Sequence, residues 1–147
     1  MGTYTRILYQ IVFHTQHWEP TLTKRNREKL FAFIAGILIK KNCFVYQVGG
    51  IEDHIHIATH VHPVISVSGL VKDIKLACVD LIRTEKLFPH FKAWDEGFGA
   101  FTYTPEAQKN LIQYVLNQEI HHKHESAREE YLRLLREFNI EFEEKYI

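Results

Sequence analysis

The stretch "NCFVYQVGGIEDHIHIATHV", residues 42–61, holds two strand-like segments on either side of Gly49 and Gly50. Valine, isoleucine, tyrosine and phenylalanine favour strands, and two adjacent glycines favour a turn. We therefore predict an antiparallel hairpin whose turn is formed by Gly49 and Gly50.

The second strand of this hairpin alternates between two kinds of side chain. Successive side chains of a strand point to opposite faces, so one face is apolar and the other collects imidazoles. The apolar face carries Ile55, Ile57, Thr59, Val61 and Pro63, and the other carries His54, His56, Ala58, His60 and His62. His54 and His56 lie about 7 Å apart along the strand, close enough to bind one ion if a third ligand reaches them. Without that ligand, they are histidines on a solvated sheet face.

Working outward from the hairpin, the chain reads as strand, helix, strand, strand, helix, strand. Residues 4–15 and 97–104 are rich in strand formers, and residues 21–41 and 66–87 carry apolar residues at helical spacing. This order predicts an α+β, ferredoxin-like fold: a four-stranded antiparallel sheet with both helices on one face. Two C-terminal helices follow. We expect a single domain over residues 1–147, with a core at 4–104, a helix at about 105–123 and a helical tail at about 125–147.

Composition supports a folded domain. The chain has 147 residues, of which 46% are hydrophobic and 13% aromatic, which argues against disorder. No window approaches the roughly 20 apolar residues of a membrane span, and "MGTYTRILYQ" lacks the zones of a signal peptide. Cys43 and Cys78 form no paired motif, so we expect reduced thiols and a cytoplasmic protein.

The formal net charge is zero, which at first argues against a nucleic-acid-binding protein. However, residues 124–147 hold seven acidic and four basic side chains, so the rest of the chain is net positive. Basic side chains cluster at Lys24, Arg25, Arg27 and Lys29 and recur at Lys72 and Lys75. Composition therefore permits contacts with nucleic acid without requiring them.

The helix at 105–123 supplies a third ligand. Its apolar stripe consists of Leu111, Ile112, Val115, Leu116 and Ile120. Tyr114 and Gln118 lie one turn apart on the flank of that stripe. Two imidazoles and the Gln118 amide oxygen leave coordination positions open for water and phosphate oxygens, which suits Mg²⁺ or Mn²⁺ better than a closed zinc site.

Tyrosine at such a position is usually a packing residue, but beside a divalent cation it has a specific use. The cation polarises a phosphodiester and offsets the charge of the transition state, so the tyrosine oxygen can attack in line. The resulting phosphotyrosine conserves the bond energy, and the strand can be rejoined without ATP.

In its motifs "DHIHI" and "QYVLNQ", the sequence resembles the HUH single-tyrosine transposases of bacterial insertion sequences, including the REP-associated tyrosine transposases. The histidine pair of that family maps onto His54 and His56, its nucleophile onto Tyr114, and its helix glutamine onto Gln118. The resemblance covers nearly all of residues 4–123, including "YQIVFHTQHWEP", "SVSGLVKDIK" and "GFGAFTYT".

The resemblance implies an activity and partners. Such enzymes cleave single-stranded DNA near hairpins as metal-dependent endonucleases and strand transferases, and leave a 5′-phosphotyrosine and a free 3′-hydroxyl. It also implies a homodimer in which the tyrosine helix of one subunit can complete the His54–His56 site of the other. DNA-contacting residues transfer less directly; the candidates are Lys72, Lys75, Lys24 and Arg25.

Three alternatives remain open. A domesticated relative would perform the same chemistry on dispersed genomic hairpins, and only the neighbouring DNA would distinguish it. A noncatalytic nucleic-acid-binding module would need exposed aromatics at the centre of the sheet, where this chain has histidines. A zinc-structural protein would use His54, His56, His60 and His62, but four imidazoles on one strand span too far for a tetrahedron.

Overall fold

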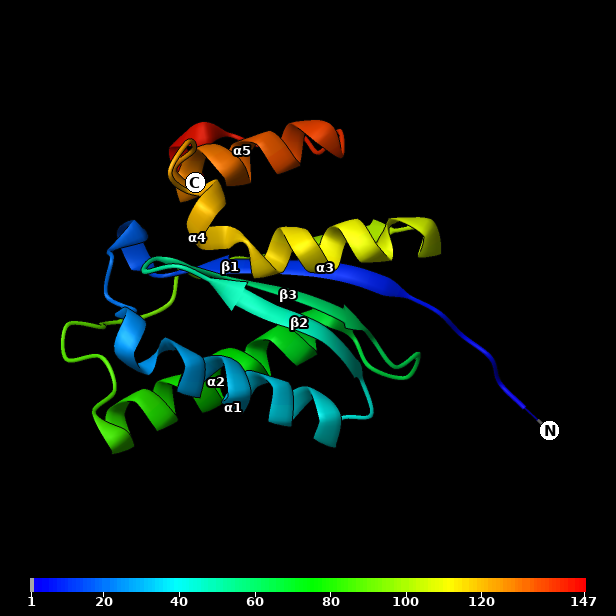
Figure 1. Ribbon diagram of the computed structural model, residues 1–147, viewed down its shortest axis with the longest axis horizontal. Coiled ribbons are helices and arrows are strands. Elements are labelled where there is room, and N and C mark those ends of the chain that lie inside the picture. The colour runs from blue at the N-terminus through cyan, green and yellow to red at the C-terminus, as the bar shows by residue number, and fades with distance from the viewer. Residues whose placement is uncertain (1) are drawn as a thin grey trace.

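Four strands form one antiparallel sheet in the computed structural model, which describes residues 2–147 (Figure 1). The strands are β1 (Leu8–His14), β2 (Phe44–Gly50), β3 (His54–His60) and β4 (Gly99–Tyr103), in the spatial order β2-β3-β1-β4. The strands β1 and β3 are therefore central. This order confirms the predicted ferredoxin-like sheet.

Helices α1 (Lys24–Lys40) and α2 (Val67–Glu85) cover one face of the sheet, as predicted (Figure 1). The apolar side chains of β3, Ile55 and Ile57, point into this layer and are fully buried. Ser66 caps α2, because its hydroxyl accepts a hydrogen bond from the Gly69 amide. No helix between residues 2 and 147 combines the length and apolar character that crossing a bilayer requires.

The other face of the sheet is covered by α3 (Gln108–Leu116), α4 (Gln118–His121) and α5 (Ala127–Glu137). The segment expected as one helix at 105–123 is thus divided. It begins with a 3₁₀ turn, η2 (Pro105–Ala107), and breaks at Asn117. Because of this break, Leu116 and Ile120 leave the predicted apolar stripe and are 55% and 61% exposed, whereas Leu111 and Val115 are buried.

The C-terminal helix α5 packs on the half of the sheet formed by β1 and β4. Its buried residues Tyr131, Leu134 and Leu135 contact Val12 and Phe101. Two further 3₁₀ turns, η1 (Gln16–Trp18) and η3 (Glu144–Tyr146), follow β1 and α5. Because of its packing on Val12 and Phe101, α5 lies over the face of the sheet that carries the histidines.

The predicted turn at Gly49 and Gly50 is wrong. Both glycines belong to β2, where they pair with His56 and Ile55, and the chain turns at residues 51–53. Gly49 is needed for close approach, since a Cβ there would lie 2.2 Å from the Val115 carbonyl oxygen of α3. Gly50 has a φ of +148°, a conformation that side chains rarely adopt.

Candidate metal and tyrosine site

The strand β3 places His54 and His56 side by side beneath α3, α4 and α5, and both are essentially fully buried. Their ring centroids are 4.8 Å apart. The Nδ1 atom of His54 is 2.8 Å from Asp53 Oδ1, and the Nδ1 atom of His56 is 2.7 Å from Gln10 Oε1. Each imidazole is thus held through its outer nitrogen, and its Nε2 atom points inward.

Gln118, the first residue of α4, lies beside these histidines. Its Oε1 atom lies 2.9 Å from His54 Nε2, and its Nε2 group donates to the Tyr114 carbonyl oxygen at 3.1 Å. The ring of Tyr114 approaches that of His56 with a centroid separation of 5.8 Å. The four residues predicted as nucleophile and ligands therefore meet within one chain.

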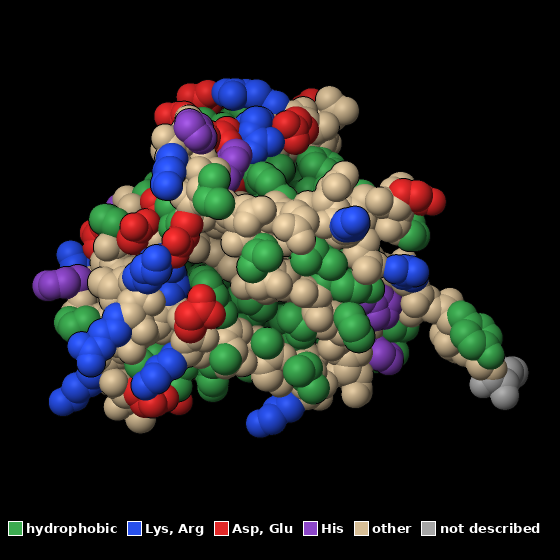
Figure 2. Space-filling model, viewed as in Figure 1, with side chains coloured by type: hydrophobic (Ala, Val, Ile, Leu, Met, Phe, Trp, Pro, Cys, Tyr) green, Lys and Arg blue, Asp and Glu red, His purple; other side chains and the backbone are tan. Residues whose placement is uncertain are grey.

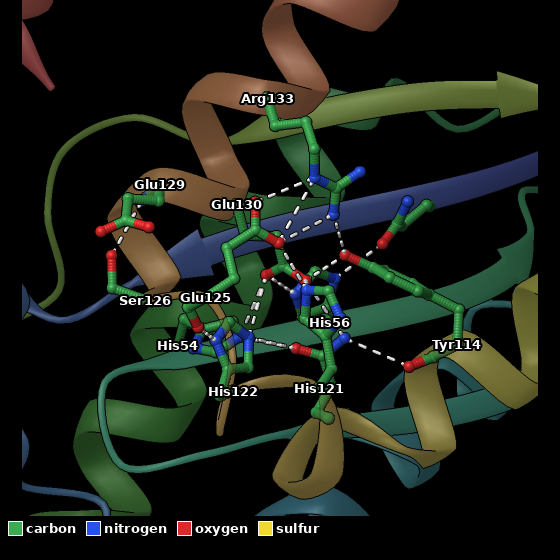
Figure 3. Close-up of polar contacts among 12 residues, drawn as sticks. His54, His56, Tyr114, His121, His122, Glu125, Ser126, Glu129, Glu130 and Arg133 are labelled. Atoms are coloured by element: carbon green, nitrogen blue, oxygen red, sulfur yellow. Dashed lines mark hydrogen bonds and ion pairs between the residues drawn. The ribbon is translucent and has the colours of Figure 1, made fainter.

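A carboxylate that the sequence did not predict lies at the centre of the site (Figure 3). Glu130 of α5 is 1% exposed, and its Oε1 atom is 2.8 Å from His56 Nε2 and 3.4 Å from His54 Nε2. Its Oε2 atom accepts hydrogen bonds from the Tyr114 hydroxyl and, at 3.3 Å, from the Gln118 amide. Glu130 thus connects the histidine pair to the tyrosine.

A third histidine completes this cluster. His122 follows α4, and its Nε2 atom is 2.8 Å from Gln118 Oε1 and 3.2 Å from Glu130 Oε1. Its Nδ1 atom is 2.6 Å from the Glu125 carbonyl oxygen. One ligand atom each from His54, His56, His122 and Glu130 lies within 4.8 Å of all the others, so these four side chains could hold a metal ion.

The Tyr114 hydroxyl lies between this cluster and the surface. Arg133 of α5 donates to its oxygen at 3.0 Å, while Glu130 accepts its proton in a hydrogen bond. Burial and the Glu130 charge raise the pKa of Tyr114 above its usual value, so the phenol is neutral. The tyrosine and Arg133 line a surface hollow of ≈260 Å³ together with Tyr103, Ala107, Asn110, Leu111, Leu134 and Glu137.

The buried charges are interdependent. Burial would raise the pKa of Glu130, but the His56, His122 and His54 rings hold it far below its usual range. Burial would lower the pKa of His54, yet the two carboxylates that contact it raise it to about 9. The pKa of His56 falls to about 4, because burial outweighs its attraction to Glu130. Burial and the ionic contacts thus oppose each other at all three residues.

The predicted DNA-contacting residues lie in two places. Lys72 and Lys75 are on α2, across the sheet from the histidines, and Lys75 Nζ donates to the Asp95 and Gly97 carbonyl oxygens at 2.7 and 2.6 Å. Lys24 and Arg25 begin α1, at the end of the molecule where Figure 2 shows basic side chains gathered. Lys24 also lines a hollow of ≈330 Å³ that His122 and Lys123 border.

The other histidines of the β3 segment are used locally. His60 Nδ1 accepts a hydrogen bond from the Ile7 amide at 2.8 Å, and His62 Nδ1 accepts one from the Val64 amide at 3.2 Å. Neither belongs to the cluster around Glu130. The four-histidine zinc site considered as an alternative is therefore not assembled in residues 2–147.

Sequence reasoning missed Glu130, His122, Gln10 and Arg133, although two of them left a signal. Gln10 is a polar residue inside an apolar strand, and it lies on the same face of β1 as Val12, which pairs with His56. Glu130 is three residues after Ala127 and four before Leu134, and both are buried. A carboxylate on the buried side of an amphipathic helix indicates a buried partner.

The family model of the IS200-like transposases matches residues 3–118. A crystal structure of a protein from Deinococcus radiodurans R1 assigned as a transposase is similar, with a TM-score of 0.63 and 17% identity, covering 80% of this chain and 95% of that one. A REP-associated tyrosine transposase bound to a REP hairpin has a TM-score of 0.62 and 12% identity, covering 83% of this chain and 74% of that one. No curated protein matches significantly.

Proposed function

Because the chain belongs to the IS200-like transposase family, we propose that it cleaves and rejoins single-stranded DNA near hairpin ends through a 5′-phosphotyrosine on Tyr114. The observation that carries this proposal is the convergence of Tyr114 with the buried His54, His56 and Gln118: its ring lies 5.8 Å from that of His56, and its hydroxyl bonds Glu130, which contacts both histidines. A noncatalytic module would have no use for a hydroxyl held between a buried carboxylate and a guanidinium.

In the proposed step, the Tyr114 oxygen attacks phosphorus as the bond from phosphorus to the 3′ oxygen breaks. The phenol proton leaves along its hydrogen bond to Glu130 and passes to solvent water, and water protonates the departing 3′ oxygen. Arg133 donates to the phenol oxygen and stabilises negative charge as it develops there. Rejoining is the reverse reaction, with a 3′-hydroxyl attacking the phosphotyrosine.

The donor set fits a divalent cation held by His54, His56 and Gln118. Each of these histidines directs its Nδ1 atom to an oxygen acceptor, which is the support that metal-binding imidazoles usually have. When bound, Mg²⁺ or Mn²⁺ would polarise the phosphoryl oxygen and orient the phosphodiester. The protein contributes the orientation of the imidazoles and excludes water from their inner nitrogens.

The DNA contacts and the assembly are also proposals. Lys24, on the hollow that reaches His122, is the predicted phosphate contact nearest the site, with Arg25 on the next residue of α1. The hairpin is proposed as a partner from the resemblance and from the hairpin-bound relative. A homodimer stays a prediction; because one chain brings Tyr114 to His54 and His56, we propose that a subunit can act in cis.

The decisive experiment is covalent trapping. Labelled single-stranded hairpin oligonucleotides from the flanking genomic DNA are incubated with the protein and Mn²⁺, Mg²⁺ or EDTA, and the products are separated on a denaturing gel. We expect a protein–DNA band that requires the metal ion, is absent in Tyr114→Phe and maps to Tyr114 by mass spectrometry.

Tyr46→Phe is the matched control, because Tyr46 is a half-buried tyrosine beside α3 with no hydrogen bond from its hydroxyl among the described contacts. It should retain the covalent band. A band that persists in Tyr114→Phe would refute the assignment of the nucleophile, and binding without any band would argue for a noncatalytic protein.

A further inference from the structure

The outer nitrogens of three buried histidines are all occupied by oxygen atoms. The Nδ1 atoms of His54, His56 and His122 face the Asp53 carboxylate, the Gln10 amide oxygen and the Glu125 carbonyl oxygen, respectively, at 2.6–2.8 Å. The NH₂ group of Gln10 donates to the Tyr103 hydroxyl at 2.6 Å. Since these oxygens can only accept, each Nδ1 atom carries its proton.

The inner nitrogens of the same histidines also face only oxygen. The three Nε2 atoms lie 2.8–3.4 Å from Glu130 Oε1 and, for His54 and His122, 2.8–2.9 Å from Gln118 Oε1. A neutral imidazole with its proton on Nδ1 has a lone pair at Nε2, so acceptors would face acceptors. Three imidazolium ions would supply the protons, but even with the Asp53 and Glu130 carboxylates beside them they would leave one uncompensated positive charge among histidine side chains that are at most 3% exposed.

A metal ion resolves this arrangement with neutral histidines. We propose that His122 and Glu130 are ligands together with His54, His56 and Gln118, and that the site therefore selects a first-row transition ion over Mg²⁺. Imidazole nitrogen is a preferred ligand of such ions, whereas Mg²⁺ favours sites built from oxygen atoms and water. The five-ligand set has three imidazole nitrogens, compared with two in the set of His54, His56 and Gln118.

This inference rests on the proposed function for the presence of an ion and deepens it by naming the class of ion. The two added ligands lie outside residues 3–118, the segment that matches the family model. His122 follows α4 and Glu130 lies in α5, whereas His54 and His56 lie in β3. An ion bound by all four would therefore join the C-terminal helices to the sheet. Glu130 can serve both roles, because Oε1 faces the histidines and Oε2 faces Tyr114.

The test measures metal binding without DNA. Metal-free protein is titrated with Mn²⁺ and Mg²⁺ by calorimetry and with Co²⁺ by visible absorption, which reports the ligands around that ion. We expect Mn²⁺ to bind at least about tenfold more tightly than Mg²⁺. His122→Ala and Glu130→Gln should each weaken Mn²⁺ and Co²⁺ binding by about tenfold or more and change the Co²⁺ spectrum.

His124→Ala is the matched control, because His124 is exposed and lies two residues from His122; it should bind like the wild type. Glu130→Gln preserves the side-chain shape, and urea unfolding in EDTA checks that each variant is folded. The inference would be overturned if folded His122→Ala and Glu130→Gln both showed the wild-type metal affinity and Co²⁺ spectrum. It would also be overturned if the wild-type protein bound Mn²⁺ and Mg²⁺ with equal affinity. A covalent DNA band formed in EDTA would also overturn the inference about the metal ligands, but it would leave the assignment of Tyr114 as the nucleophile intact. Metal binding as expected without a covalent band would refute the proposed function alone.

Discussion

Replacing Gly49 with alanine should displace the helix that carries Tyr114 without altering any polar residue of the site. Gly49 lies in β2 against the backbone of α3, and an added Cβ would be 2.2 Å from the Val115 carbonyl oxygen and 3.2 Å from Val115 Cγ1. Real Cβ atoms essentially never approach closer than 3.0 Å, so α3 has to move by about 0.8 Å. Tyr114 immediately precedes Val115 and moves with it.

The magnitude follows from this displacement. Overpacking of a close contact costs typically about 1–3 kcal/mol of unfolding free energy. A shift of about 1 Å in a reacting group can cost roughly 100-fold in rate. We therefore expect Gly49→Ala to lower the free energy of unfolding, measured by urea denaturation, by about 1–3 kcal/mol. The rate of covalent DNA attachment should fall by one to two orders of magnitude.

Gly36→Ala is the control for this prediction. Gly36 lies inside α1, and an added Cβ would meet nothing within 4 Å. Alanine is the better helix former, so this variant should gain about 0.5–1 kcal/mol of unfolding free energy. Its rate of covalent DNA attachment should equal that of the wild type. If Gly49→Ala unfolds and reacts like the wild type, the close packing of β2 and α3 does not position Tyr114.

Three further predictions concern other parts of the molecule. Burial raises the pKa of Cys78 to about 12, so its thiol stays protonated at neutral pH and should react with a chromogenic thiol reagent only after urea unfolding; rapid native labelling would contradict this. Lys24→Ala should weaken DNA binding and reduce the slope of log affinity against log salt by about one, whereas an unchanged slope would exclude a phosphate contact. Leu134→Ala removes a buried contact of α5 and should lower the free energy of unfolding, measured by urea denaturation, by about 2–5 kcal/mol. A loss below about 1 kcal/mol would mean that this packing does not hold α5 on the sheet.

The sheet and the histidine pair could be predicted because their signals are local. Alternation along β3 separates Ile55 and Ile57 from His54 and His56, and the structure has this division. Tyr114 and Gln118 were paired by helical spacing alone, and they remain close although the helix breaks at Asn117 between them. The break itself was not predicted, because no proline or glycine marks it.

The remaining part of the site depends on tertiary contacts. The spacing of α5 places Glu130 beside an apolar stripe, but spacing does not say which part of a sheet the stripe covers. That choice is made by packing of Tyr131 and Leu134 on Val12 and Phe101, which brings the carboxylate over His56. Gly49 was misassigned for a related reason: its role depends on Val115, a residue far away in the sequence.

The contact between His56 and Glu130 joins positions 74 residues apart at 2.8 Å. An ion bound there would act like a removable disulfide, because it would close a long loop and restrict the unfolded chain. In the chain-entropy description, a cross-link of this span is worth about 4 kcal/mol. The availability of the ion would then set how often α5 detaches from the sheet. Amide hydrogen exchange in the C-terminal third would follow metal concentration, and the protein would be most easily opened where the ion is scarce.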